Sequence, residues 1–135
     1  MNKVRIGIVL YLVAVLSGCG GQGNKKRVSV LEESIENYTQ ALRWNMMDDA
    51  ASYHVNRDGE KAMIDLEPVK SIRVTSYHIT GKTINDDFTE ASVNGELNYY
   101  STDYGTLSEL PLNQKWWYQE SSGKWFLESD FPEFK

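Results

Sequence analysis

The chain has 135 residues, a single cysteine and a formal net charge of −5. This length suits one domain, and a lone cysteine excludes an internal disulfide. Nucleic acids bind to basic surfaces, so the acidic balance argues against a nucleic acid partner.

The first segment has the pattern of a secretory signal. Lys3 and Arg5 precede an uncharged apolar run at residues 6–16, IGIVLYLVAVL, and small residues follow it. The run is too short for a membrane-spanning helix, which needs about 20 apolar residues. A basic start, a short apolar run and a small-residue exit are typical of a signal peptide, which is removed from the mature protein.

The end of this signal resembles the lipobox of bacterial lipoproteins, carried by Leu16, Ser17, Gly18 and Cys19. The resemblance implies that residues 1–18 are removed, and that Cys19 receives a diacylglyceryl group on its thiol and an acyl chain on its amine. Two or more acyl chains hold a protein stably at a membrane. Gly20 resembles the default residue of outer-membrane lipoproteins, which implies a cell-envelope protein that faces the periplasm.

Residues 19–28 are predicted to form the lipidated cysteine and a flexible tether. The stretch GGQGNKKR at residues 20–27 has three glycines and no apolar residue, which is typical of a flexible linker. Lys25, Lys26 and Arg27 form a basic cluster that either contacts anionic headgroups or stays solvated within the tether. Residues 29–135 are predicted to form a single domain.

A long helix is predicted to open this domain. Ser29 and Glu32 have the spacing of a capping box, which marks a helix start. The helix is predicted to end near Val55, after about 25 residues or roughly 37 Å. A second, short helix is predicted at residues 60–66, before Pro68. Apolar residues with the spacing of one helix face follow the capping box at Leu31, Ile35, Tyr38, Leu42, Met46, Ala50 and Tyr53.

Four strands are predicted after Pro68, at residues 69–80, 88–100, 106–119 and 123–131, separated by turn residues. The Asn94-Gly95 dipeptide, a strong turn signal, would alternatively form a tight hairpin within the second of them. Apolar and polar residues keep their alternation from Ala91 through Tyr99, so we favour a bulge within one long strand.

This order of elements predicts an α+β fold, with a long N-terminal helix packed on a curved antiparallel sheet of about four strands. The order resembles the nuclear-transport-factor-2-like and cystatin-like architectures. The ending QKWWYQESSGKWFLESDFPEF also resembles the last hairpin of small bacterial lipoproteins with such a fold. The resemblance implies that any cavity lies between the helix and the sheet.

Catalytic chemistry has little support in the sequence. His54 and His78 lack the spacing to each other or to carboxylates that a metal site or a catalytic pair requires. No nucleophile motif, phosphate-binding loop or cofactor fingerprint occurs. We therefore predict no cofactor and no catalytic, metal-binding or cofactor-binding residue. The sequence favours a protein without enzymatic activity.

The aromatic residues are more informative. Neighbours on a strand point to opposite faces, so Trp116 opposes Trp117 and Trp125 opposes Phe126. By the same rule, Ile72 and Val74 oppose Tyr77 and Ile79 unless a bulge intervenes. The sheet face away from the helix is then partly aromatic, and it would be covered by a chain segment, a second copy or a partner.

Two functions follow from these patterns. The first is a non-enzymatic binding or assembly module, which contacts a protein partner or a second copy through Trp117 and Phe126. The second is a pocket for a small ligand, or for catalysis, between helix and sheet. Tyr53, His54, Tyr99 and Trp116 would line that pocket. The strand pattern leaves open whether Trp116 or Trp117 faces the helix.

Overall fold

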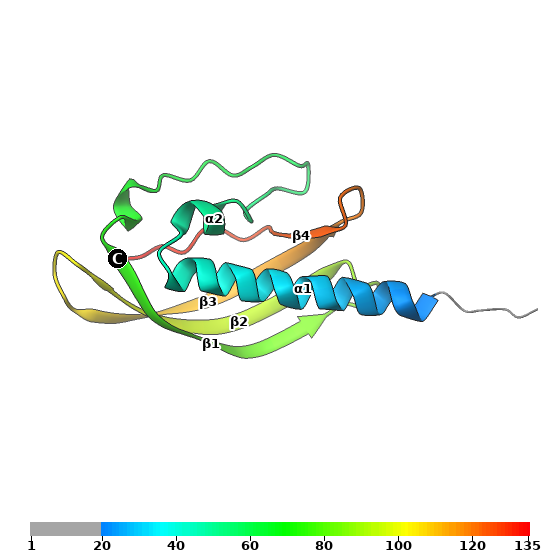
Figure 1. Cartoon of the computed structure of the whole chain (residues 1–135), viewed down its shortest axis with the longest axis horizontal. Coiled ribbons are helices and arrows are strands. Elements are labelled where there is room, and N and C mark those ends of the chain that lie inside the picture. Colours follow the sequence, from blue (N-terminus) through cyan, green and yellow to red (C-terminus); the bar gives the residue numbers. More distant parts are fainter. Residues whose placement is uncertain (1–19) are drawn as a thin grey trace, which may run out of the picture.

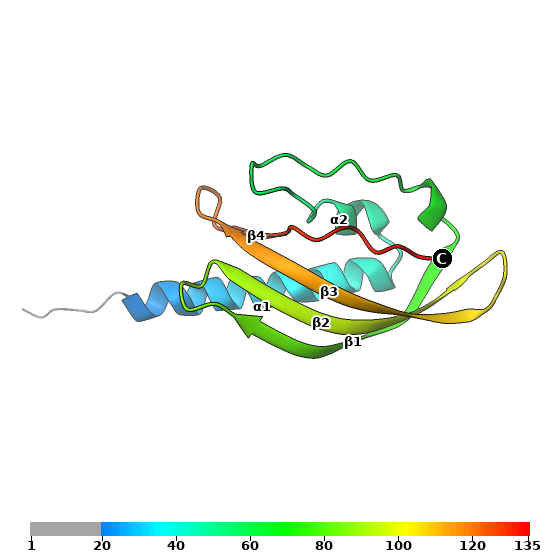
Figure 2. The same cartoon turned by 180° about the vertical axis from the view of Figure 1, so that it is seen from behind.

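The computed structural model describes residues 20–135, and one long helix lies across one face of a four-stranded antiparallel sheet (Figure 1). The elements are α1 (Gly20–Arg43), α2 (Met47–Ala51), the 3-10 turn η1 (Glu67–Val69), β1 (Ile72–Ile84), β2 (Glu90–Ser101), β3 (Leu107–Gln119) and β4 (Lys124–Leu127). The strands pair in the order β1-β2-β3-β4. The predicted α+β fold is therefore confirmed, and Figure 2 shows the face of the sheet that α1 leaves uncovered.

The start of α1 differs from the prediction. The helix begins at Gly20, so the stretch predicted as a flexible linker is helical, and Ser29 lies inside the helix. Glycine disfavours helix, but elongating an existing helix costs far less than nucleating one. The first turns of α1 extend beyond the sheet (Figures 1 and 2). Cys19 and the predicted signal lie outside the described residues.

The end of α1 also differs from the prediction, because the helix stops at Arg43 and not near Val55. Asn45 adopts a left-handed conformation with φ of 59°, which asparagine tolerates better than most residues. A new helix, α2, then begins at Met47, and Met47 and Ala50 are buried. The predicted helix at residues 60–66 is absent from the described chain, and only the short turn η1 forms nearby.

The core lies between α1 and the inner face of the sheet. The stripe predicted for the helix is confirmed over its first four members, Leu31, Ile35, Tyr38 and Leu42, which are all at most 4% exposed. They belong to one cluster with buried sheet residues that include Val93, Leu97, Leu112, Trp116 and Leu127. No helix within residues 20–135 is long and apolar enough to cross a membrane.

The Asn94-Gly95 dipeptide does not form a turn, because β2 runs through it without interruption. The predicted long strand is confirmed, but the bulge lies in the neighbouring strand β1, where the register shifts between Ile79 and Gly81. The Thr80 hydroxyl at this bulge donates to the carbonyl of Asn94. A Cβ atom at Gly95 would lie 2.8 Å from the backbone oxygen of His78, so the strands approach closely because of this glycine.

A second bulge in β1 decides which side chains face the helix. The register shifts between Val74 and Ser76, so Thr75 is the extra residue. This shift puts Tyr77 opposite Leu97, on the same inner face as Val74. The opposition predicted for β1 in the absence of a bulge therefore does not occur.

The outer face of the sheet is polar over most of its area. The outward residues of β2 are Glu90, Ser92, Asn94 and Glu96, and all four are exposed. Apart from Tyr100 near the end of β2, the aromatic residues of this face lie where β3 meets β4. There Trp117 pairs with Phe126.

The outer edge of β4 is joined by a short segment that follows α2. The amide of Leu127 donates to the carbonyl of Tyr53, and the amide of Val55 donates to the carbonyl of Leu127. This pairing is parallel and involves His54 opposite Leu127. The chain then doubles back, because Val55 also pairs with Lys61 in an antiparallel bridge.

Candidate functional site

Trp116 and Trp117 are both buried, by different parts of the chain. Trp116 faces α1 and is 1% exposed, and its ring packs edge-on against Tyr38 and Tyr53. Trp117 faces the other way, yet it is only 7% exposed. Its indole nitrogen donates to the carbonyl of Val55 over 2.8 Å, so a segment of the same chain covers it.

The predicted interaction surface at Trp117 and Phe126 is therefore not available on this side of the sheet. Phe126 is half-buried, with its ring centroid 5.7 Å from that of Trp117. Arg57 fastens the covering segment through ion pairs to Glu90 and Glu128, at 2.6 and 2.9 Å. The sequence left open whether a chain segment, a second copy or a partner covers this face, and the structure shows that a segment of the same chain covers Trp117.

The four predicted pocket residues do not share one cavity. Tyr53, His54 and Trp116 meet around Tyr38, and these rings pack against one another at centroid distances of 5.6–5.9 Å. Tyr99 belongs to a different contact, because its ring packs on Phe134 and its hydroxyl accepts from the amide of Lys135. The rings themselves thus fill the space where the sequence predicted a pocket.

His54 is held as a neutral imidazole. It is 2% exposed, and the Tyr38 hydroxyl lies 2.9 Å from its Nε2 atom. Its Nδ1 atom lies 2.8 Å from the carbonyl oxygen of Ser129, which only accepts hydrogen bonds. Nδ1 therefore carries the proton, and Tyr38 donates to Nε2. Both ring nitrogens are used within the fold, and burial lowers the pKa of the His54 imidazole.

This burial predicts a pH-dependent stability. The unfolded chain protonates His54 near the ordinary pKa of 6.5, whereas the folded chain resists protonation until a lower pH. Between those two pKa values the unfolded state binds more protons, so the free energy of unfolding falls as the pH drops below about 6.5. Urea unfolding of the unmodified chain and of His54→Gln at pH 8 and pH 5 measures this effect.

The variant His54→Gln should lose less stability than the unmodified chain over that interval, because it has no imidazole to protonate. His78 supplies the matched variant, since its side chain is exposed on β1. We expect His78→Gln to keep most of the original pH dependence. Equal losses in the unmodified chain and in His54→Gln would contradict the expectation.

An open groove of about 780 Å³ runs between α1 on one side and α2 and β4 on the other. α1 contributes Asn37 and Gln40 to one wall, and the opposite wall contains Asp49 and Trp125. Trp44 stands at the end of the groove where α1 stops, and its side chain is 75% exposed. A concave surface with an exposed tryptophan is a frequent feature of binding sites.

The sequence predicted a pocket between helix and sheet, but of its four predicted lining residues only Tyr53 lines this groove, and Trp44 was not among them. Trp44 falls outside the apolar stripe of the helix, between Leu42 and Met46, and that offset was the only available sign of its exposure. Of the predicted site residues, Tyr53 and Phe126 do line the groove. His54, Tyr99, Trp116 and Trp117 contribute to the packing described above, and Cys19 lies outside the described residues.

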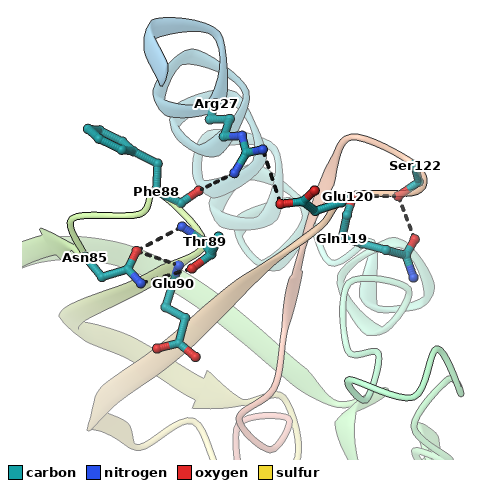
Figure 3. Close-up of polar contacts among 8 residues, drawn as sticks. All are labelled: Arg27, Asn85, Phe88, Thr89, Glu90, Gln119, Glu120 and Ser122. Carbon is teal, nitrogen blue, oxygen red and sulfur yellow. Dashed lines mark hydrogen bonds and ion pairs between the residues drawn. The ribbon is translucent and has the colours of Figure 1, made fainter. Parts of the chain in front are cut away.

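In the first half of α1, a polar cluster around Arg27 joins the helix to the β1–β2 turn and the β3–β4 turn (Figure 3). The Arg27 guanidinium contacts the carbonyl of Phe88 at 3.5 Å and the carboxylate of Glu120 at 3.3 Å, and it lies 4.3 Å above the ring of Tyr118. The Trp125 indole donates to the carbonyl of Arg27. Arg27 therefore belongs to the folded domain, whereas Lys25 and Lys26 are exposed.

The same cluster fixes the turn between β1 and β2. The side-chain oxygen of Asn85 accepts from the amides of Thr89 and Glu90, at 2.9 and 3.0 Å (Figure 3). Phe88 in this turn has a φ of 55°, an uncommon value for a bulky residue. The hydrogen bonds of Asn85 and Arg27 on either side hold that conformation.

Comparison of the chain with models of protein families, with curated proteins and with solved structures gives no match. The lipobox and the likeness to nuclear-transport-factor-2-like domains thus stay predictions from the sequence. The groove and the contacts around it are the features of the described residues that bear on function.

Proposed function

We propose that this chain is a lipid-anchored protein of the bacterial cell envelope, held at a membrane through Cys19, whose domain is a non-enzymatic binding module. The lipobox at residues 16–19 supports the anchor, and Gly20 supports an outer-membrane location facing the periplasm. α1 includes Gly20, the first residue that the structure describes. An anchored domain would therefore be joined to its lipid by helix and not by a loose linker.

The groove carries the proposal that the domain binds a partner. Trp44 is 75% exposed and Met46 is 52% exposed, and both line it. Tryptophan is enriched among the residues that dominate binding energy at interfaces. A groove that is open to solvent suits a macromolecule, and the rings of Tyr38, Tyr53 and Trp116 pack against one another where three of the predicted pocket residues meet.

Photo-crosslinking in cells tests this proposal on the full chain. A photoreactive amino acid at position 44 should give a covalent adduct, and the same amino acid at position 104 should not. Tyr104 is the matched control because it is also an exposed aromatic residue, at 85%, and does not line the groove. An adduct of twice the chain's mass would identify a second copy as the partner.

The purified partner then gives the quantitative result. Trp44→Ala should weaken its binding about 30-fold, the effect of losing roughly 2 kcal/mol at an interface hot spot. Tyr104→Ala should leave the affinity within a factor of about three. Equal adducts at positions 44 and 104, or no adduct at position 44, would count against a binding role for the groove.

A further inference from the structure

Phe88, in the turn between β1 and β2, has a strained backbone conformation and no role in the core. Its φ of 55° is rare for a bulky side chain, whereas glycine adopts such values readily. Neither Phe88 nor its neighbour Val28 in α1 belongs to the core cluster or packs against it. Strain at a residue that does not contribute to core packing indicates a function for its side chain.

The Phe88 side chain forms an apolar patch with the first turns of α1. Figure 3 shows the carbonyl of Phe88 facing Arg27 and the ring pointing to the other side. The ring borders a shallow hollow of about 370 Å³, whose exposed surface is mostly apolar. The residues that line this hollow are Asn24, Lys25, Val28 and Phe88, and we call them the Phe88 patch. Phe88 and Val28 are half-buried, and the other two are exposed.

The Phe88 patch lies at the end of the molecule where the proposed anchor is. α1 includes Gly20, and its first turns extend beyond the sheet (Figures 1 and 2). At 1.5 Å per residue, Val28 lies about 12 Å along the helix from Gly20. An amphipathic helix on a membrane buries its apolar side about 5–10 Å deep at the headgroup boundary. Tilting α1 toward the bilayer therefore brings the patch into contact with the surface that would hold Cys19.

Charged residues of both signs surround the Phe88 patch. Lys25 and Lys26 are exposed on α1, and Asp86 and Asp87 are exposed in the adjacent turn. The nearby Arg27 already has an ion-pair partner in the β3–β4 turn. A zwitterionic headgroup offers a phosphate to the lysines and an ammonium group to the aspartates, whereas a strongly anionic surface repels the aspartates. The charges therefore favour a zwitterionic lipid surface.

We propose that the Phe88 patch docks the domain on a zwitterionic lipid surface, with the Phe88 ring at the boundary between headgroups and acyl chains. Burying the ring and Val28 removes apolar area from water, as it does for amphipathic helices on membranes. The domain would then keep one orientation and not turn freely about its anchor. The proposal rests on the lipid anchor proposed above and adds a second contact with the same bilayer.

Docking through the Phe88 patch leaves the groove accessible. Val28 lines the patch, whereas Val30 lines the groove. Residues two positions apart on an α-helix point about 200° apart, and therefore to opposite sides. The groove would face away from the bilayer, where a partner can reach Trp44.

Photo-crosslinking on vesicles tests the orientation of the full lipidated chain. The vesicles contain phosphatidylethanolamine and phosphatidylcholine, and a photoreactive phenylalanine analogue replaces residue 88 or residue 122. Ser122 is the matched control, because it is exposed in the β3–β4 turn, at the same end of the molecule (Figure 1). We expect at least about tenfold more lipid adduct at position 88 than at position 122, in low and in high salt.

The variant Phe88→Asn separates docking from folding. Asparagine tolerates positive φ, so this variant should be at least as stable as the unmodified chain in urea unfolding. With a photoreactive group at position 86, Phe88→Asn should lower the lipid adduct at least about tenfold.

Leu107→Asn is the matched control for this variant. It removes an apolar side chain that is 64% exposed, at the start of β3. The turn between β2 and β3 lies at the opposite end of the molecule from the start of α1 (Figure 1). The lipid adduct at position 86 should therefore change less than about threefold in Leu107→Asn.

The outcomes distinguish docking from the anchor itself. Equal adducts at positions 88 and 122, or an adduct at position 86 that Phe88→Asn leaves unchanged, would overturn docking by this patch. An adduct at position 88 that needs anionic lipid, or that high salt abolishes, would overturn the zwitterionic surface as the partner. In each case a palmitate label on Cys19 would still support the anchor, whereas a chain without that label would overturn the anchor and the docking that depends on it.

Discussion

Replacing Trp116 with alanine is expected to lower the free energy of unfolding by about 3–5 kcal/mol, as for other large aromatic residues in protein cores. Trp116 is 1% exposed and packs edge-on against Tyr38 and Tyr53, which belong to α1 and to the segment after α2. Its removal leaves a cavity where helix, segment and sheet meet. Urea unfolding followed by circular dichroism measures the loss.

Trp44→Ala is the matched control, because it removes the same side chain from a site that is 75% exposed. Surface substitutions of this kind usually change stability by at most about 0.5 kcal/mol. The same pair of variants therefore separates folding from binding, since Trp44→Ala is expected to lose the partner and keep its stability. Similar losses of stability in the two variants would contradict the packing described here.

Replacing Cys19 with serine is expected to abolish lipidation completely. The serine hydroxyl is a far weaker nucleophile than a thiol, so no thioether to diacylglycerol forms, and the second acylation does not follow. Each buried methylene group of an acyl chain contributes about 0.8 kcal/mol to membrane binding, so the anchor dominates the attachment. Metabolic labelling with an alkyne analogue of palmitate, followed by intact-mass measurement, detects the lipid and the removal of residues 1–18.

Two further variants make this test specific. Adding Ser29→Cys to the Cys19→Ser chain restores a thiol elsewhere, and it should not restore labelling. Replacing residues 1–19 with an ordinary cleavable secretory signal should yield a soluble periplasmic domain. Retained label in Cys19→Ser, or label at position 29, would show that the lipobox reading is wrong.

The sheet was largely predictable because its pattern is local. The alternation from Ala91 to Tyr99 has the period of a half-buried strand, and β2 follows it. The bulges in β1 were harder to predict from the sequence, since they depend on how the residues around Thr75 and Thr80 pair with the neighbouring strand. That register is set by contacts between residues distant in sequence.

The helix bounds were harder to predict because tertiary packing overrides local preference. Met46 and Ala50 continue the spacing of the stripe, so no break was visible, although Asn45 turns the chain between Leu42 and Met46. At the other end, three glycines suggested a linker, yet α1 runs through them. In both places the apolar pattern and the intrinsic preference of the residues gave misleading bounds.

The candidate site shows the same limit more strongly. The rule that neighbours on a strand face opposite ways correctly separated Trp116 from Trp117. It gave no information about the segment that folds back over Trp117, which is held by Val55 and Arg57. The groove arises where α1, α2 and β4 meet, and no single stretch of sequence encodes that meeting point.

The two bulges of β1 have a consequence for how densely the protein can be crowded. β1 is the outermost strand and runs for 13 residues, a length at which a regular edge invites other chains to pair and grow into fibres. Thr75 and Thr80 interrupt its regular backbone pairing at two points. Their hydroxyls donate hydrogen bonds to β2, to the backbone carbonyls of Asn98 and Asn94. Copies of the protein held close together on a surface would thus not form a continuous sheet through their β1 edges, and they would remain separate molecules.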